Sequence, residues 1–102
     1  MVEVRWTPLA LEDIDNIAEY IAKDSEKFAL IQTERFFERA LILINQPNAG
    51  RIVPEANDKT LRELISGNYR IIYRVISKSR IDILTVHHSA KQLPVITAFE
   101  DI

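Results

Sequence analysis

The stretch "LRELISGNYRIIYRV" runs from Leu61 to Val75. Two runs rich in β-branched and aromatic residues flank a short polar turn at residues 66–68, which predicts a β-hairpin. The hairpin carries three arginines and a glutamate: Arg62, Glu63, Arg70 and Arg74. Because an unpaired charge is costly to bury, these side chains require either a solvated face of the sheet or a binding site.

Two further strands extend this hairpin. Residues 80–88 follow the second run after another three-residue turn, so 60–65, 69–76 and 80–88 predict an antiparallel meander. Near the start of the chain, residues 2–6 (VEVRW) alternate between apolar and charged side chains and predict one more strand.

Helical periodicity occupies the region between the first strand and the hairpin. Residues 7–23 place apolar side chains on one stripe, with Thr7 as the N-cap and Pro8 at the first helical position. Residues 26–45 predict a second helix with more apolar residues than one stripe needs, and 47–59 predict a loop. The first helix has four acidic residues that we expect to face water, namely Glu12, Asp13, Asp15 and Glu19.

The order is therefore β-α-α-β-β-β. It predicts a single α+β domain over residues 1–102, with a helical hairpin packed on one face of a four-stranded, mainly antiparallel sheet and the other face free. The tail, residues 89–102, is broken by Pro94 and gives no clear element.

Composition limits the function. The chain of 102 residues has 47% hydrophobic and 27% charged residues, as expected of a globular domain. It has no cysteine, which excludes disulfides and thiolate sites, and no stretch predicts a signal peptide or a membrane span, so we expect a cytoplasmic protein. A net charge of −2 argues against strong non-selective binding to nucleic acid, although the second half of the chain is the more basic one.

The strand at residues 69–76 separates its side chains onto two faces. Tyr69, Ile71, Tyr73 and Val75 form the more apolar set, so we expect them to pack under the helices. The helix-free face then carries a set of candidate binding residues: Arg51, Arg62, Glu63, Arg70, Arg74 and Lys91. Cross-strand pairs of arginine and glutamate can simply keep such a face soluble, whereas convergent guanidinium groups can bind phosphate or carboxylate.

Two histidines end the last strand. His87 and His88 are adjacent, so a regular strand points them to opposite faces, and they cannot share one metal ion. A structural role, or a hydrogen bond at the end of the sheet, is the simpler interpretation. We find no metal motif, no glycine-rich phosphate loop and no catalytic-triad spacing, and therefore expect no metal and no cofactor.

The combination of segments resembles a known family. "IAEYIA" in the first helix, "PNAGRIVPE" in the loop, the hairpin stretch and "IDILTVHHSAKQL" resemble the ParE branch of the RelE/ParE superfamily, the toxins of bacterial type II toxin-antitoxin modules. The resemblance covers about residues 2–93. It implies the RelE/ParE-like fold, a toxin function, and a cognate antitoxin, ParD-like or similar, in a hetero-oligomer.

The superfamily divides by target. ParE-like members are known as inhibitors of DNA gyrase, whereas RelE-like members resemble ribonucleases that cleave mRNA in the ribosome. By resemblance, a nuclease site here would use Arg62, Arg70, His87 and His88. The chain lacks the RelE-like arginine and tyrosine near the end of the last strand, because no tyrosine follows Tyr73. We therefore expect a non-enzymatic gyrase inhibitor, with a ribosome-dependent nuclease and a non-toxic antitoxin binder as alternatives.

The same resemblance gives the surplus apolar residues of the second helix a partner. Antitoxins of these modules fold a disordered C-terminal segment over the toxin, and such a segment needs an exposed apolar groove. The candidates for this groove are Phe28, Ile31, Phe37 and Leu41. An ordinary core or a homodimer contact is the alternative role for these four residues.

Overall fold

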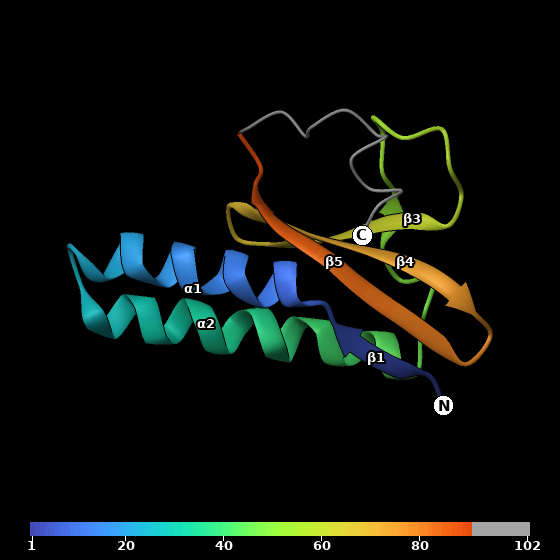
Figure 1. Ribbon diagram of the computed structural model, residues 1–102, viewed down its shortest axis with the longest axis horizontal. Helices are drawn as coiled ribbons and strands as arrows, with labels where there is room; N and C mark the ends of the chain where they lie inside the picture. The colour runs from blue at the N-terminus through green and yellow to red at the C-terminus, as the bar shows by residue number, and fades with distance from the viewer. Residues whose placement is uncertain (91–102) are drawn as a thin grey trace.

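The chain forms a helical hairpin that lies across one face of a twisted sheet (Figure 1). The structure is a computed structural model and describes residues 1–90. Its elements, in chain order, are β1 (Glu3–Trp6), α1 (Pro8–Ala22), α2 (Glu26–Ala40), the 3-10 helix η1 (Leu41–Ile44), β2 (Arg51–Ile52), β3 (Leu61–Ser66), β4 (Tyr69–Ser77) and β5 (Arg80–His88). The predicted α+β fold is confirmed.

The strands are ordered β1-β5-β4-β3-β2, and β1 runs parallel to β5 while the other neighbours are antiparallel. The sheet has five strands instead of the predicted four, because Arg51 and Ile52 of the predicted loop pair with Glu63 and Arg62 of β3. This short strand begins the segment that later crosses the helix-free face.

Both helices begin where the sequence predicts. Thr7 Oγ1 accepts a hydrogen bond from Ala10 N at 3.2 Å and donates one to Ile83 O at 2.8 Å, so the N-cap also fixes α1 to β5. Ser25 caps α2 in the same way, at 3.1 Å from Phe28 N. The second helix is regular only to Ala40, and its expected last turn tightens into η1.

The main core lies between the helices and the sheet. Ile71 and Tyr73 of β4 are fully buried there, with Tyr69 and Val75 packed against them, as predicted from the alternation. The two helices contribute Ala10, Ile14, Phe36 and Ala40. Phe36 meets Tyr69 edge-on, with ring centroids 5.3 Å apart.

A β-bulge changes the alternation of β5. Ile72 pairs with Thr85 while Tyr73 pairs with Ile83, so Leu84 is an extra residue in the strand. Beyond the bulge, His87 lies opposite Arg70 on the helix-free face, and His88 lies opposite Tyr69 on the helix-covered face. The two histidines thus point to opposite faces, as predicted.

Asp13 corrects one prediction for α1. Its carboxylate accepts hydrogen bonds from the Val86 backbone N–H at 3.0 Å and from the Thr85 hydroxyl, instead of facing water. The strand β1 pairs only with residues 80–83 of β5, so Asp13 satisfies a backbone donor on the part of β5 that β1 does not reach.

Candidate functional site

The sequence predicts that the helix-free face of the sheet is uncovered, and this is wrong. Residues 53–60 partly cover that face. Val53 and Ala56 are buried against Leu61, Ile72 and Leu84 in a second, smaller apolar cluster. Burial of these two apolar side chains holds residues 53–60, the crossing segment, against the sheet. It also brings Glu55 and Asp58 over the sheet.

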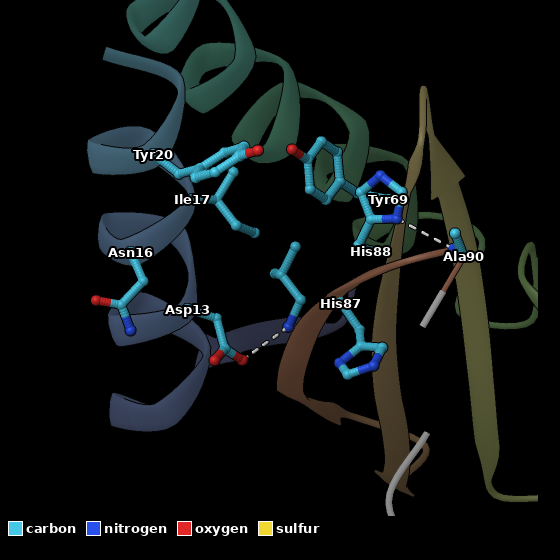
Figure 2. Close-up of a pocket in the computed structure, with 9 residues that line it drawn as sticks. Asp13, Asn16, Ile17, Tyr20, Tyr69, His87, His88 and Ala90 are labelled. Atoms are coloured by element: carbon cyan, nitrogen blue, oxygen red, sulfur yellow. Dashed lines mark hydrogen bonds between the residues drawn. The ribbon is translucent and has the colours of Figure 1, made fainter. Parts of the chain in front are cut away.

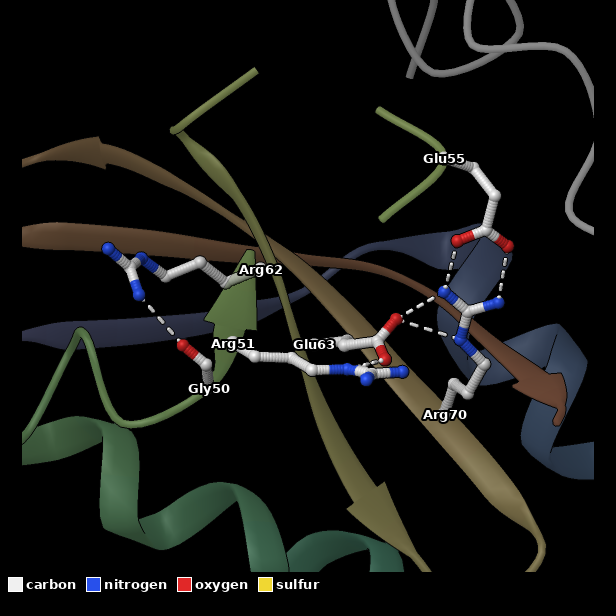
Figure 3. A network of polar contacts seen from close by, with 6 residues as sticks. All are labelled: Gly50, Arg51, Glu55, Arg62, Glu63 and Arg70. Carbon is white, nitrogen blue, oxygen red and sulfur yellow. Dashed lines mark hydrogen bonds and ion pairs between the residues drawn. The ribbon is translucent and has the colours of Figure 1, made fainter. Parts of the chain in front are cut away.

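Beside this cluster, four charged side chains form one network, shown in Figure 3. Arg70 donates from Nε to Glu63 Oε1 at 2.8 Å, and its Nη2 also reaches the same oxygen. Its two terminal nitrogens bind Glu55 in a bidentate fork, at 2.7 and 2.9 Å. Arg51 Nε donates to the second oxygen of Glu63 at 2.6 Å.

Burial makes this network unusual. Glu63 is 1% exposed and Arg70 is 6% exposed, so each is a charge taken almost completely out of water. Such burial is tolerable only when every charge has a partner of opposite sign. Hydrogen bonds from Arg70 hold the pKa of Glu55 below its usual value, and the carboxylates of Glu55 and Glu63 raise the pKa of Arg70.

Arg74 lies on the same face, two residues after Ile72 on β4. Its Nη1 is 3.6 Å from Asp58 Oδ2, which belongs to the crossing segment, and the β4–β5 register places Asp82 opposite it. The crossing segment therefore supplies an acidic partner to each of the two β4 arginines.

The prediction that Arg62 shares this face is wrong. In the β3–β4 register Arg62 lies opposite Tyr73 and Glu63 lies opposite Ile72, so Arg62 belongs to the helix-covered side. Adjacent charged residues, Arg62 and Glu63, gave no alternation from which the face could be chosen. It is Glu63 that joins Arg70 on the helix-free face.

Arg62 instead holds the loop before β2. Its Nη1 donates to Gly50 O at 2.8 Å, and the Tyr73 hydroxyl donates to Pro47 O and accepts from Gly50 N, both at 2.9 Å. A Cβ at Gly50 would lie 2.8 Å from the Tyr73 hydroxyl and would also clash with the backbone oxygen of Glu63. The "PNAGR" segment is thus a close approach of backbone to sheet that only glycine permits.

A hollow of about 640 Å³ lies on the other side of the sheet, between α1 and the ends of β4 and β5 (Figure 2). Tyr20 and Tyr69 point toward each other across it, and burial raises the pKa of Tyr69. His88 packs edge-on against Tyr69 at 5.3 Å between centroids, and its Nδ1 accepts from Ala90 N at 3.1 Å. These contacts give His88 a structural role at the end of the sheet.

The four apolar candidates, three on α2 and Leu41 at the start of η1, do not form one groove. Phe28 is 63% and Leu41 is 60% exposed, whereas Ile31 is half-buried and Phe37 packs on Trp6 with ring centroids 4.8 Å apart. Residues nine apart on a helix lie about 180° from each other, so Phe28 is on the opposite side from Phe37.

A different set on the helix lies on one stripe. Leu30 precedes Phe37 by seven residues and Leu41, the first residue of η1, by eleven, which brings all three within about 40° of arc about the axis of α2. Leu30 is 62% exposed. The stripe formed by Leu30, Phe37 and Leu41 is therefore the larger exposed apolar surface on this helix, and the sequence-based choice had omitted Leu30.

The remaining predictions concern Lys91, the tail, metal sites and membrane spans. Lys91 and the tail from residue 91 onward lie outside the described residues. Within residues 1–90, no group of three or more histidine and acidic side chains is placed to hold a metal ion, and no helix there is long and apolar enough to cross a membrane.

Chemically, the helix-free face can recognise carboxylates but is poorly arranged for phosphoryl transfer. Arg70 already uses Nε and both terminal nitrogens, and both oxygens of Glu63 accept from arginines, which leaves Glu63 ill-suited as a general base.

Comparison with known proteins identifies the family of this chain. The family model of the ParE toxin of the type II toxin-antitoxin system parDE matches residues 4–93. The chain belongs to the ParE toxin family. The match runs from Val4, the second residue of β1, past the end of β5, so the Arg70 network and the stripe of Leu30, Phe37 and Leu41 lie within the ParE domain.

Two relatives illustrate this ParE similarity. Y4kP of Sinorhizobium fredii, which its name describes as a candidate toxin, is 34% identical over 93 residues, which span 89% of this chain and 92% of that protein. The structure of the chromosomal ParDE toxin-antitoxin system from P. aeruginosa superposes with a TM-score of 0.71 at 25% identity, covering 86% of this chain and 96% of that one.

Sequence reasoning missed two carboxylates of this ParE chain that make long-range contacts: Glu55 of the network, and Asp13 of α1, which binds β5. Glu55 stands in an aperiodic loop, 15 residues before its partner Arg70, and nothing local signals the contact. Asp13 looked like one of several solvated helix acids. Only its position on the sheet-facing edge of α1, one residue before the buried Ile14, could have singled it out.

Proposed function

We propose that this chain is the toxin of a parDE-type module, that it inhibits DNA gyrase by binding it, and that a cognate, ParD-like antitoxin neutralises it. Membership of the ParE family supports the toxin role. The observation that carries the binding mechanism is the state of Arg70. The residue is 6% exposed, and its guanidinium is bound by two carboxylates. Arg70 therefore does not present an open phosphate site.

The surroundings of Arg70 favour binding over catalysis as well. Proton transfer in RNA cleavage needs a base and an acid near the scissile phosphate. The Tyr73 hydroxyl is on the other face and is bound to Pro47 and Gly50, and Glu63 is saturated by Arg70 and Arg51. The chain would therefore act in the cytoplasm on a protein target, with Arg51, Arg74 and the surface around Arg70 as contact residues.

The antitoxin surface in this proposal is the stripe of Leu30, Phe37 and Leu41. Two of its three members are about 60% exposed, and an isolated monomer gains nothing from placing such side chains in water. An amphipathic antitoxin segment would bury them in the manner of a helix in a groove. Phe28, on the opposite side of α2, and the half-buried Ile31 would contribute less.

The experiment is a supercoiling assay with purified gyrase, relaxed plasmid and increasing amounts of the chain. We expect supercoiling to fall with the concentration of the chain, and equimolar antitoxin to restore it. Unchanged supercoiling at a large excess of the chain would contradict gyrase inhibition. Harmless expression without antitoxin would contradict the toxin role and favour a toxin-fold protein that only binds its partner.

One observation favours a second candidate, the ribosome-dependent nuclease. The β4–β5 register places His87 directly opposite Arg70, so an arginine and a histidine share one rung of the helix-free face. A histidine can serve as a general acid or base near neutral pH. Release of Arg70 from Glu55 would be the necessary first step for this activity, and mRNA cleavage in a translation extract measures it.

A further inference from the structure

The bidentate pair between Arg70 and Glu55 has two very different halves. The Arg70 side chain is 7% exposed, whereas the Glu55 side chain is 43% exposed and stands on the crossing segment. Val53 and Ala56 on either side of Glu55 are buried and fix the backbone. Rotation of the Glu55 side chain alone would therefore uncover the terminal nitrogens of Arg70 without moving the segment.

Once uncovered, the guanidinium would remain in position. Glu63, whose side chain is 0% exposed, binds Nε and Nη2 of Arg70 and is itself held by Arg51. The guanidinium plane is thus fixed from behind, and the Nη1 and Nη2 atoms used by Glu55 face outward. A fixed fork of this kind binds an incoming carboxylate with little loss of conformational entropy.

Charge decides which anion fits. With Glu55 turned away, the remaining group of Arg51, Arg70 and Glu63 carries one net positive charge. A single carboxylate neutralises it, as Glu55 does, whereas a dianionic phosphate would leave a net negative charge beside the buried Glu63. The distances to Glu55, 2.7 and 2.9 Å, show that a planar carboxylate reaches both terminal nitrogens of Arg70 at once.

We propose that the Arg70 fork is a carboxylate-recognition site for an acidic segment of a protein partner, and that Glu55 occupies this site in the unbound chain. The partner's aspartate or glutamate replaces Glu55 one for one, so the number of charge-assisted hydrogen bonds is conserved and the exchange carries little net penalty. The site stands independently of gyrase as the target, because any partner with an exposed acidic segment can enter it.

The test compares three proteins: the wild-type chain, Glu55→Ala and the matched control Asp58→Ala. The control removes the same charge from the same segment, but its partner Arg74 lies 3.6 Å away in a monodentate contact. Thermal unfolding is followed in sodium acetate, sodium phosphate and sodium chloride of equal ionic strength. We expect acetate to raise the Tm of Glu55→Ala by roughly 4 °C over chloride, and to change the other two proteins by less than about 1 °C.

A second readout uses hexaglutamate peptide, with hexaglutamine as the uncharged control. Glu55→Ala should bind hexaglutamate about tenfold more tightly than the wild-type chain does, because the peptide no longer competes with Glu55. Equal acetate effects in all three proteins, or equal peptide affinities, would overturn the site. A larger Tm increase in phosphate than in acetate would overturn the assignment to carboxylate. None of these measurements contains gyrase, so their failure is distinct from failure of the proposed function.

Discussion

The two faces of the sheet are stabilised in different ways. On the helix-covered face, Phe36, Ile71 and Ile83 are fully buried in a continuous apolar core. On the helix-free face, a cluster of five apolar residues adjoins the Arg51–Glu63–Arg70–Glu55 network. Truncation of a buried apolar side chain lowers stability in proportion to the volume removed. Removal of one member of a buried charge network lowers it further, because the partner charge is left unpaired. The charged residues of the helix-free face therefore act as a coupled set, and the effect of changing one of them depends on the others.

The largest expected effect comes from splitting the network. Arg70→Met leaves Glu63 buried without its main partner, and we expect a loss of about 3–5 kcal/mol in the free energy of unfolding. Adding Glu63→Leu removes the stranded charge and should recover most of that loss. Urea denaturation of the single and double variants measures both values.

The helix-covered face supplies the control for this coupling. Phe36→Ala should cost a similar amount, about 3–5 kcal/mol, because it opens a cavity in the core. A second substitution, of another core residue by a smaller apolar one, should not restore the lost free energy of unfolding. If the Arg70→Met and Glu63→Leu double variant is no more stable than Arg70→Met alone, the two faces do not differ in the way described.

A smaller effect is expected where the loop before β2 touches the sheet. Gly50→Ala should cost about 1–3 kcal/mol through overpacking, because the new methyl group meets Tyr73 and the Glu63 backbone oxygen. Combining it with Tyr73→Phe should not relieve the cost, since the backbone oxygen stays and two hydrogen bonds are lost. Thermal melts of the three variants decide this, and full rescue by Tyr73→Phe would show that the hydroxyl was the sole obstacle.

The pH dependence of stability should isolate the exposed half of the network. Hydrogen bonds from Arg70 hold the pKa of Glu55 below its ordinary value of 4.5, so the folded state binds this proton less readily than the unfolded state. The contribution is therefore fully present above about pH 4.5 and is lost as the pH falls through the lower, folded-state pKa.

Because 43% of the Glu55 side chain is exposed, solvent screening limits this contribution to about 1 kcal/mol. Glu55→Gln should flatten the loss of stability below pH 4.5, as measured by urea denaturation at a series of pH values. An identical acid profile in the wild-type chain and in Glu55→Gln would mean that Glu55 does not contribute.

The smallest effect on stability is expected outside both faces, on the exposed stripe of α2. Leu41→Glu should change the free energy of unfolding by no more than about 0.5 kcal/mol, because Leu41 is 60% exposed. It should nevertheless weaken antitoxin binding at least tenfold, as measured by calorimetry. Phe28→Glu, on the opposite side of the helix, is the matched control. A greater loss of affinity from Phe28→Glu would assign the antitoxin to the other side.

Much of the fold could be predicted because its signals are local. The caps at Thr7 and Ser25, the polar turn at 66–68 and the alternation of β4 each depend on a few neighbouring residues. They gave the element order and the core-facing side of β4. The two-residue β2 was missed because it is defined by its pairing with β3 and has no pattern of its own.

The candidate site was harder to predict because its geometry depends on register and on distant contacts. Charges at both Arg62 and Glu63 left the face of β3 undecided, and the bulge at Leu84 reset the alternation of β5. Glu55 reaches Arg70 only because Val53 and Ala56 anchor the crossing segment. Sequence reasoning therefore identified Arg70 as important but not the carboxylates that define its chemistry.

We infer that Arg70 serves protein recognition and not RNA cleavage, and the Glu55→Gln variant distinguishes the two roles. This variant weakens the carboxylate clamp on Arg70 while keeping the size of the side chain, so a masked nuclease would become more active. The measurement is the length of a reporter mRNA in a translation extract, with the wild-type chain and Glu55→Gln side by side. Our account predicts intact mRNA with both proteins. Cleavage that increases with Glu55→Gln and disappears in Glu55→Gln combined with Arg70→Lys would contradict it.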